Sequence, residues 1–215
     1  MIPAHEALAR LQEGNRRFVS GVRSAHAFTN QERRDELAAG QEPHAIILGC
    51  SDSRVPAEIV FDQGLGDLFV IRVAGNIVAY SQVGSVEFAA ERFGTRLVVV
   101  LGHTQCGAIL ATLEELRQPT EAQSRNLRSI VDRVRPSVEP LLATGLSPEA
   151  LVRQAVRANI RASANHLRHG SDVLEQLTQE RGLLVVGAEY SLETGIVEFF
   201  DGVPEPGAHA VRRGG

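Results

Sequence analysis

The stretch LVVVLGHTQCGAILATLEELR, residues 97–117, decides the fold because a strand pattern passes directly into a helix pattern within it. Residues 97–102 form a short, β-branched apolar run, typical of a strand buried on both faces of a parallel sheet. Residues 106–117 have the spacing and composition of a helix that begins directly after this strand. A buried strand followed at once by a helix is half of a βαβ unit, which predicts an open α/β sheet.

Three further apolar runs of strand length extend this prediction outward. They alternate with helical patterns, so we expect four parallel strands joined by right-handed crossovers. The run GIVEFF at 195–200 comes too soon after the preceding strand for a crossover, which predicts an antiparallel edge strand. The expected fold is therefore an α/β open sheet of four parallel strands plus a fifth antiparallel edge strand, flanked by helices. The other parallel strands are expected at HAIILGC (44–50), LFVIRV (68–73) and LLVVGA (183–188), and the helices at 81–94, 147–170 and 171–182.

The first 40 residues lie outside this alternating pattern. Residues 1–21 read as an amphipathic helix, with Ala4, Leu8, Leu11 and Phe18 on one side. We expect residues 1–40 to form an N-terminal helical arm that packs on a partner subunit. We expect residues 41–215 to form a single α/β domain, which carries the cysteines and the histidine discussed below.

Composition and charge exclude several classes of protein. The chain has 215 residues, 43% of them hydrophobic, and a formal net charge of -4, whereas nucleic-acid-binding proteins are usually basic. No apolar run reaches the length of about 18 residues that a membrane span needs. The N-terminus carries acids and lacks an apolar core, so no secretory signal is expected and the cytoplasm is the predicted location. Two cysteines cannot make a disulfide framework.

Both cysteines and one histidine lie at the end of a predicted strand or within a few residues after it. Cys50 ends the first strand, and His103 and Cys106 follow the third. Functional groups of open α/β sheets lie beyond the carboxyl ends of the strands, so these three side chains converge if the two strands are neighbours. Two sulfurs and one imidazole suit zinc, and three ligands leave the fourth position open, as in catalytic sites. Buried free cysteines are also common in cores, but two cysteines at strand ends favour a metal site.

Asp52 and Arg54 lie next to the first predicted ligand. Two thiolates already neutralise Zn²⁺, so this ion should acidify water less than one held by three histidines. We therefore expect Asp52 to accept a hydrogen bond from the zinc-bound hydroxide, with Arg54 keeping the carboxylate ionised. The alternative for this pair is a simple salt bridge in a turn. Its place beside a metal ligand favours the catalytic interpretation.

Nucleotide-binding α/β proteins are the main competitors at the level of fold. A dinucleotide enzyme needs G-x-G-x-x-G after the first strand, where this chain has GCSDSRVP. The P-loop pattern G-x-x-x-x-G-K-[ST] does not occur either. The sequence therefore favours the metal site over both alternatives.

Four segments resemble the β-class carbonic anhydrases: CSDSRVPAE (50–58), FVIRVAGN (69–76), GSVEFAA (84–90) and LGHTQCGA (101–108). The similarity runs from about Gln41 through GAEYSLETG (187–195), most of the chain. The resemblance implies a lyase that reversibly hydrates CO₂ to bicarbonate and a proton. It implies one Zn²⁺ per chain on Cys50, His103 and Cys106, and a homodimer or dimer of dimers.

The resemblance also implies a CO₂ pocket, with some residues contributed by the neighbouring subunit. Phe88 stands where many members have Tyr, and Ala74 stands where a larger aliphatic residue is frequent. Both differences predict a wider pocket and leave the chemical steps unchanged. The implied pocket residues are Gln41, Phe69, Ala74, Phe88 and Gly107.

Some members of the family have a closed state, in which the counterpart of Asp52 binds zinc, and a second site for bicarbonate. At that second site Arg72 and Tyr190 match, but Ile47 replaces a Trp. We expect a closed state at lower pH, with Asp52 as fourth metal ligand, and weaker bicarbonate binding.

The same fold and metal site would also suit two other functions. One is a catalytically silent zinc-stabilised or bicarbonate-sensing domain, which the intact Asp52–Arg54 pair disfavours. The other is a relative that hydrates carbon disulfide or carbonyl sulfide.

Overall fold

A computed structural model describes residues 1–24, 31–119 and 124–204 of the chain. Its centre is a five-stranded sheet in the order β2-β1-β3-β4-β5. The first four strands are parallel, and β5 is antiparallel to β4 at one edge. The predicted fold class is confirmed. The strands are β1 (Ala45–Gly49), β2 (Leu68–Arg72), β3 (Leu97–His103), β4 (Leu184–Tyr190) and β5 (Val197–Asp201).

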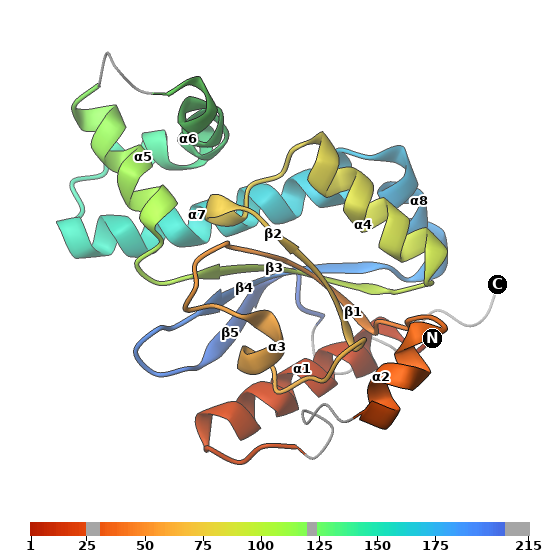
Figure 1. The fold of residues 1–215 in the computed structure, drawn as a ribbon. Coiled ribbons are helices and arrows are strands. Elements are labelled where there is room, and N and C mark those ends of the chain that lie inside the picture. Colours follow the sequence, from red (N-terminus) through yellow and green to blue (C-terminus); the bar gives the residue numbers. More distant parts are fainter. Residues whose placement is uncertain (25–30, 120–123, 205–215) are drawn as a thin grey trace.

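Helices cover both faces of this sheet (Figure 1). On one face lie α4 (Tyr80–Arg92), α7 (Pro148–His169) and α8 (Asp172–Arg181). On the other lie α1 (Ala4–Val19), α2 (Gln31–Ala38) and the short α3 (Ala57–Val60). Beyond the carboxyl ends of the strands stand α5 (Gly107–Arg117) and α6 (Arg125–Val138), and two 3-10 turns occupy Ala74–Asn76 (η2) and Glu139–Ala143 (η3).

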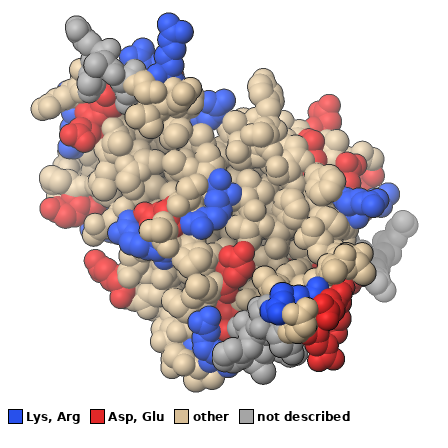
Figure 2. Space-filling model, viewed as in Figure 1, with Lys and Arg blue, Asp and Glu red and all other residues tan. Residues whose placement is uncertain are grey.

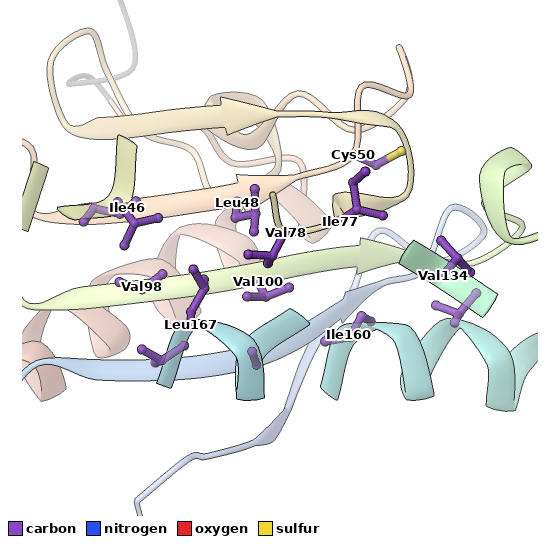
Figure 3. Close-up of a cluster of buried hydrophobic side chains, with 14 of the residues drawn as sticks. Ile46, Leu48, Cys50, Ile77, Val78, Val98, Val100, Val134, Ile160 and Leu167 are labelled. Atoms are coloured by element: carbon purple, nitrogen blue, oxygen red, sulfur yellow. The ribbon is translucent and has the colours of Figure 1, made fainter. Parts of the chain in front are cut away.

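The core consists of two apolar layers separated by the sheet. Alternate residues of a strand point to opposite faces, so Ile46 and Val98 face α4 and α7, while Ile47 and Val99 face α1. Figure 3 shows the first layer, in which Leu167 of α7 packs over the middle of β3. Every residue of β3 is buried, as expected of a central strand covered on both faces.

The N-terminal helix α1 packs on the sheet of its own chain. Ala7, Leu8 and Leu11 belong to the same buried layer as the residues of β1 and β3 on that face. The predicted apolar side of this helix is therefore buried within the chain, whereas α2 has no buried residue. Packing of residues 1–40 on a partner subunit stays a prediction.

The helices show how α7 begins and that none of those described is suited to cross a membrane. The Ser147 side chain accepts a hydrogen bond from the Ala150 amide and caps α7, with Pro148 at the first helical position. In the parts of the chain described here, every helix is too short or too polar to cross a bilayer.

Candidate metal centre

The metal centre lies at the carboxyl ends of β1 and β3, which are neighbouring strands as the sequence required. Gly49 pairs with Leu101, so Cys50 and His103 emerge at the same edge of the sheet. Cys106 follows after a tight turn and is the N-cap residue of α5. Gln105 makes this turn in a left-handed conformation (φ 55°), which is uncommon for a residue other than glycine.

The three predicted ligands converge. The Cys50 and Cys106 sulfurs lie 3.9 Å apart, and these two atoms and a His103 ring nitrogen all lie within 4.8 Å of one another. Two thiolates on a tetrahedral zinc, each at about 2.3 Å from the ion, lie about 3.8 Å apart. The spacing of the sulfurs therefore fits zinc without rearrangement.

The His103 ring is oriented for a metal. The side chain is fully buried, and Nδ1 donates a hydrogen bond of 2.9 Å to the Thr104 carbonyl. This bond places the proton on Nδ1, so that Nε2 presents a lone pair. Nε2 is buried and has no hydrogen-bond partner. A buried acceptor without a partner is costly, and a metal ion between this nitrogen and the two sulfurs satisfies it.

The electrostatics of the two thiols also favour a cation between them. The hydrogen bond from Cys106 lowers the pKa of Cys50, against the opposing effect of burial, and the Gly75 amide, which donates to Cys50 Sγ at 3.4 Å, acts in the same direction. The bond to Cys50 and burial together raise the pKa of Cys106. Two adjacent buried thiols cannot both ionise unless a cation lies between them, and zinc provides that charge.

Asp52 and Arg54 form the expected pair. Arg54 donates from Nε and Nη2 to the two Asp52 carboxylate oxygens at 2.8 and 2.7 Å, and its backbone N–H adds a third bond of 3.0 Å. The hydrogen bonds from Arg54 hold the pKa of Asp52 well below its usual range. Asp52 Oδ2 is 3.8 Å from His103 Nε2, so the carboxylate borders the metal centre. It is paired with Arg54 in this structure and is not part of the ligand cluster.

Arg72 supports the loop that carries Cys50 and Asp52, in a way that the sequence did not indicate. Its Nε donates to the Cys50 carbonyl at 2.9 Å, and its Nη2 donates to the Asp52 carbonyl at 2.5 Å. Arg72 ends β2, the strand next to β1, so its side chain spans the loop that carries the ligand and the carboxylate. The sequence marked Arg72 as an arginine at the end of an apolar strand run and, by resemblance, as part of a bicarbonate site, but not as a support of this loop.

The other residues of the predicted bicarbonate site lie in the core. Ile47 is fully buried and Tyr190 nearly so, both in the layer that faces α1. Burial raises the pKa of the Tyr190 hydroxyl. The Arg72 side chain contacts the loop of Cys50 and Asp52, and the Tyr190 carbonyl accepts a hydrogen bond of 2.9 Å from the amide of Thr104, which follows His103.

The predicted pocket residues divide into groups. Gly107 follows the ligand Cys106, and Ala74 precedes Gly75 in the η2 turn, so both lie at the metal-centre edge. Phe69 and Phe88 instead pack with each other, with ring centroids 6.2 Å apart, between β2 and α4. Gln41 is exposed at the amino-terminal end of β1, opposite Cys50. The chain alone therefore does not bring these residues together.

Comparison with known proteins gives one consistent result. A family model described as carbonic anhydrase matches residues 45–197. Carbonic anhydrase 2 of Mycobacterium tuberculosis is 40% identical over 185 residues, covering 86% of this chain and 87% of the relative. A carbonic anhydrase of Mycolicibacterium smegmatis is 40% identical over 188 residues, covering 87% and 89%.

Solved structures agree with the sequence relatives. The β-carbonic anhydrase CafA of Aspergillus fumigatus superposes with a TM-score of 0.72 at 27% identity, covering 93% of this chain and 91% of the other. The Coccomyxa β-carbonic anhydrase gives 0.70 at 25% identity, covering 90% and 86%. With its Cys-His-Cys cluster at the carboxyl edge of the sheet, the chain belongs to the β-class carbonic anhydrase family.

Proposed function

We propose that this protein catalyses the zinc-dependent conversion of CO₂ and water to bicarbonate and a proton, and the reverse reaction. The observation that carries the proposal is the buried, unpartnered Nε2 of His103, which lies against two cysteine sulfurs 3.9 Å apart. Cys50, His103 and Cys106 would hold one zinc ion. Such an ion lowers the pKa of a water at its open position, so that the water can act as a nucleophile near neutral pH.

Asp52 and Arg54 supply the orientation that this reaction needs. An ionised carboxylate only accepts hydrogen bonds, so Asp52 would accept the remaining proton of the nucleophile in a hydrogen bond. This bond would turn the lone pair of the nucleophile toward the carbon of CO₂. Arg54 fixes the carboxylate through two parallel hydrogen bonds. Arg72 fixes the backbone beneath it through the Cys50 and Asp52 carbonyls.

We also propose a closed state in which Asp52 leaves Arg54 and takes the fourth ligand position at lower pH. The support is geometric: the Asp52 carboxylate already lies 3.8 Å from His103 Nε2, and its side chain is 17% exposed. Structures determined at low and high pH test this state. Activity that stays flat on acidification, with Asp52 paired to Arg54 throughout, contradicts it.

Regulation by bicarbonate at Arg72 and Tyr190 is proposed to be weak. Ile47 offers no donor where other members have an indole N–H, and Arg72 already donates to two carbonyls. Titration with bicarbonate, followed by activity, should show little inhibition; strong inhibition with a sigmoidal response contradicts the proposal.

We propose that a second copy of the chain completes the CO₂ pocket. Phe88 is 53% exposed and Tyr80 is 95% exposed, both on α4 beside the edge strand β2. In Figure 2 the surface over β2 and the first turns of α4 is largely uncharged, whereas charged side chains lie at the other end of α4. Gln41 is too far from Cys50 within one chain, so a neighbouring subunit is needed to bring such a residue to the pocket.

Reduced cysteines as ligands suit the cytoplasm, which we propose as the location.

Zinc analysis and stopped-flow CO₂ hydration test the main proposal. The purified protein should contain one zinc per chain and hydrate CO₂, and Cys106→Ser should lose both properties. Ser53→Ala, an exposed change in the same loop as Asp52, should keep both. Zinc without CO₂ hydration would favour a silent or sensing domain, and activity confined to carbon disulfide or carbonyl sulfide would favour the sulfur-substrate alternative.

A further inference from the structure

Asn159 is a polar side chain in an apolar part of the molecule. It lies in the middle of α7, is 2% exposed, and has the core residues Ala155, Val156 and Ile160 as neighbours on the helix. Burying an amide in such surroundings is costly unless its hydrogen bonds are made. Asparagine is also a poor helix former, so local preference does not explain it.

The amide of Asn159 makes a contact that leads to the metal centre. Its Nδ2 donates to the Gly75 carbonyl at 2.7 Å, a buried bond between residues 84 positions apart in the sequence. Gly75 in turn donates its backbone N–H to Cys50 Sγ at 3.4 Å. One short chain of hydrogen bonds therefore links α7 to a predicted zinc ligand. In Figure 3, Ile160, which follows Asn159, lies near the end of the sheet that carries Cys50.

The conformation of Gly75 explains why outside support is needed. Gly75 lies in the η2 turn with φ 70° and ψ 18°, a left-handed conformation that glycine adopts readily. A Cβ at this position would lie 3.1 Å from the Ala108 Cβ, so a larger residue fits poorly. A glycine has no side chain to restrict its own backbone. The bond from Asn159 holds the peptide that follows Gly75, and the N–H that donates to Cys50 belongs to the peptide that precedes it. The bond therefore acts on the N–H by limiting the φ and ψ rotations of Gly75 that join these two peptides.

We infer that Asn159 is a positioning residue for the metal centre: it fixes Gly75 so that the Gly75 N–H donates to the sulfur of Cys50. This inference rests on the proposed zinc site. The N–H···S bond orients the ligand sulfur and withdraws electron density from it, and groups that support ligands in this way typically contribute about 10- to 100-fold to metal affinity.

Zinc affinity and the spectrum of the cobalt-substituted protein test the inference. Asn159→Leu keeps the branched shape of the side chain, with bulkier methyl groups, and removes the donor, and Asn159→Ala removes the donor without crowding. We expect both variants to bind zinc about 10- to 100-fold more weakly than the wild type in competition with a chromophoric chelator. We also expect the thiolate-to-cobalt charge-transfer band to shift, because the sulfur of Cys50 loses its hydrogen bond.

Leu167→Ala is the matched control. Leu167 is a fully buried residue of the same helix, but it packs over the middle of the sheet, away from Cys50 (Figure 3). This variant should lose thermal stability and keep the zinc affinity and the cobalt spectrum of the wild type. The inference is overturned if the Asn159 variants bind zinc within twofold of the wild type, or if Leu167→Ala weakens zinc binding equally. A wild-type protein that binds no zinc would instead overturn the proposed function.

Discussion

Arg54 shows how much of the proposed chemistry depends on one side chain. Its guanidinium is the main cause of the lowered pKa of Asp52 and fixes both carboxylate oxygens. Arg54→Gln should therefore leave an acid that is present but poorly oriented. We expect kcat/KM for CO₂ hydration to fall about 100-fold, in the range typical of a lost acid–base group, while zinc content stays at one per chain.

Stopped-flow assays and metal analysis on the same preparations check this prediction. Ser53→Ala lies between the two residues of the pair, is exposed, and should keep full activity. Activity of Arg54→Gln within twofold of the wild type would show that the pair is only a salt bridge in a turn.

The ionisation of His44 should make the stability of the protein depend on pH. It is 7% exposed, its Nε2 has no partner, and burial lowers its pKa below 6.5, with Asp67 opposing and Arg10 adding to the shift. The folded protein then binds fewer protons than the unfolded chain as pH falls below 6.5. His44 should therefore reduce the free energy of unfolding progressively as the pH is lowered from 7 to 5.

Urea unfolding of the wild type and His44→Gln at several pH values isolates this effect. The loss of stability between pH 7 and pH 5 should be smaller in His44→Gln, because glutamine does not titrate. Parallel curves for the two proteins would mean that His44 titrates normally when folded.

Asn15 connects three elements on the other face of the sheet. Its Nδ2 donates to the Val60 and Gly195 carbonyls at 3.1 and 2.9 Å, and its Oδ1 accepts from the Val197 amide at 2.8 Å. These bonds join α1 to the end of α3 and to the start of β5. Asn15→Leu should cost about 2 to 3 kcal/mol, because it leaves buried backbone groups without partners.

Thermal and urea unfolding measure this cost, with Gln12→Ala as the control on the same helix. Gln12 is partly exposed, and its replacement should change stability by less than about 0.5 kcal/mol. A similar small effect for Asn15→Leu would mean that water replaces the lost bonds and that α1 is held by apolar contacts alone.

The elements that could be predicted from the sequence are those whose signal is local. The run at 97–102 is apolar throughout because β3 is covered on both faces, and this pattern is visible without any partner. The ligands were predictable because they directly follow such runs. Arg72, Gly75 and Asn159 were missed as supporting groups because they act through backbone carbonyls and amides that only the folded chain brings together.

The two edges of the sheet differ in a way that bears on the whole molecule. The β5 edge carries ion pairs, in which Arg168 contacts Asp201 and Arg157 contacts Glu198. Charged side chains on an edge strand discourage pairing with another chain. The β2 edge instead carries the aromatic side chains Phe69 and Phe88, together with Phe93. A second copy is therefore expected at the β2 edge.

Phe88→Arg tests this expectation because it places a charge at the centre of the apolar edge. We expect the wild type to sediment as a dimer or dimer of dimers, and Phe88→Arg to dissociate toward monomer and lose most of its CO₂ hydration, since each pocket would lack its neighbour. Leu127→Arg changes a similarly exposed residue on α6, Leu127 being 57% exposed against 53% for Phe88, and should keep the mass and activity of the wild type. Sedimentation equilibrium at several concentrations measures the masses. A monomeric wild type, or a Phe88→Arg protein with unchanged mass, would mean that the aromatic cluster only closes the core beside β2 and that each chain forms its pocket alone.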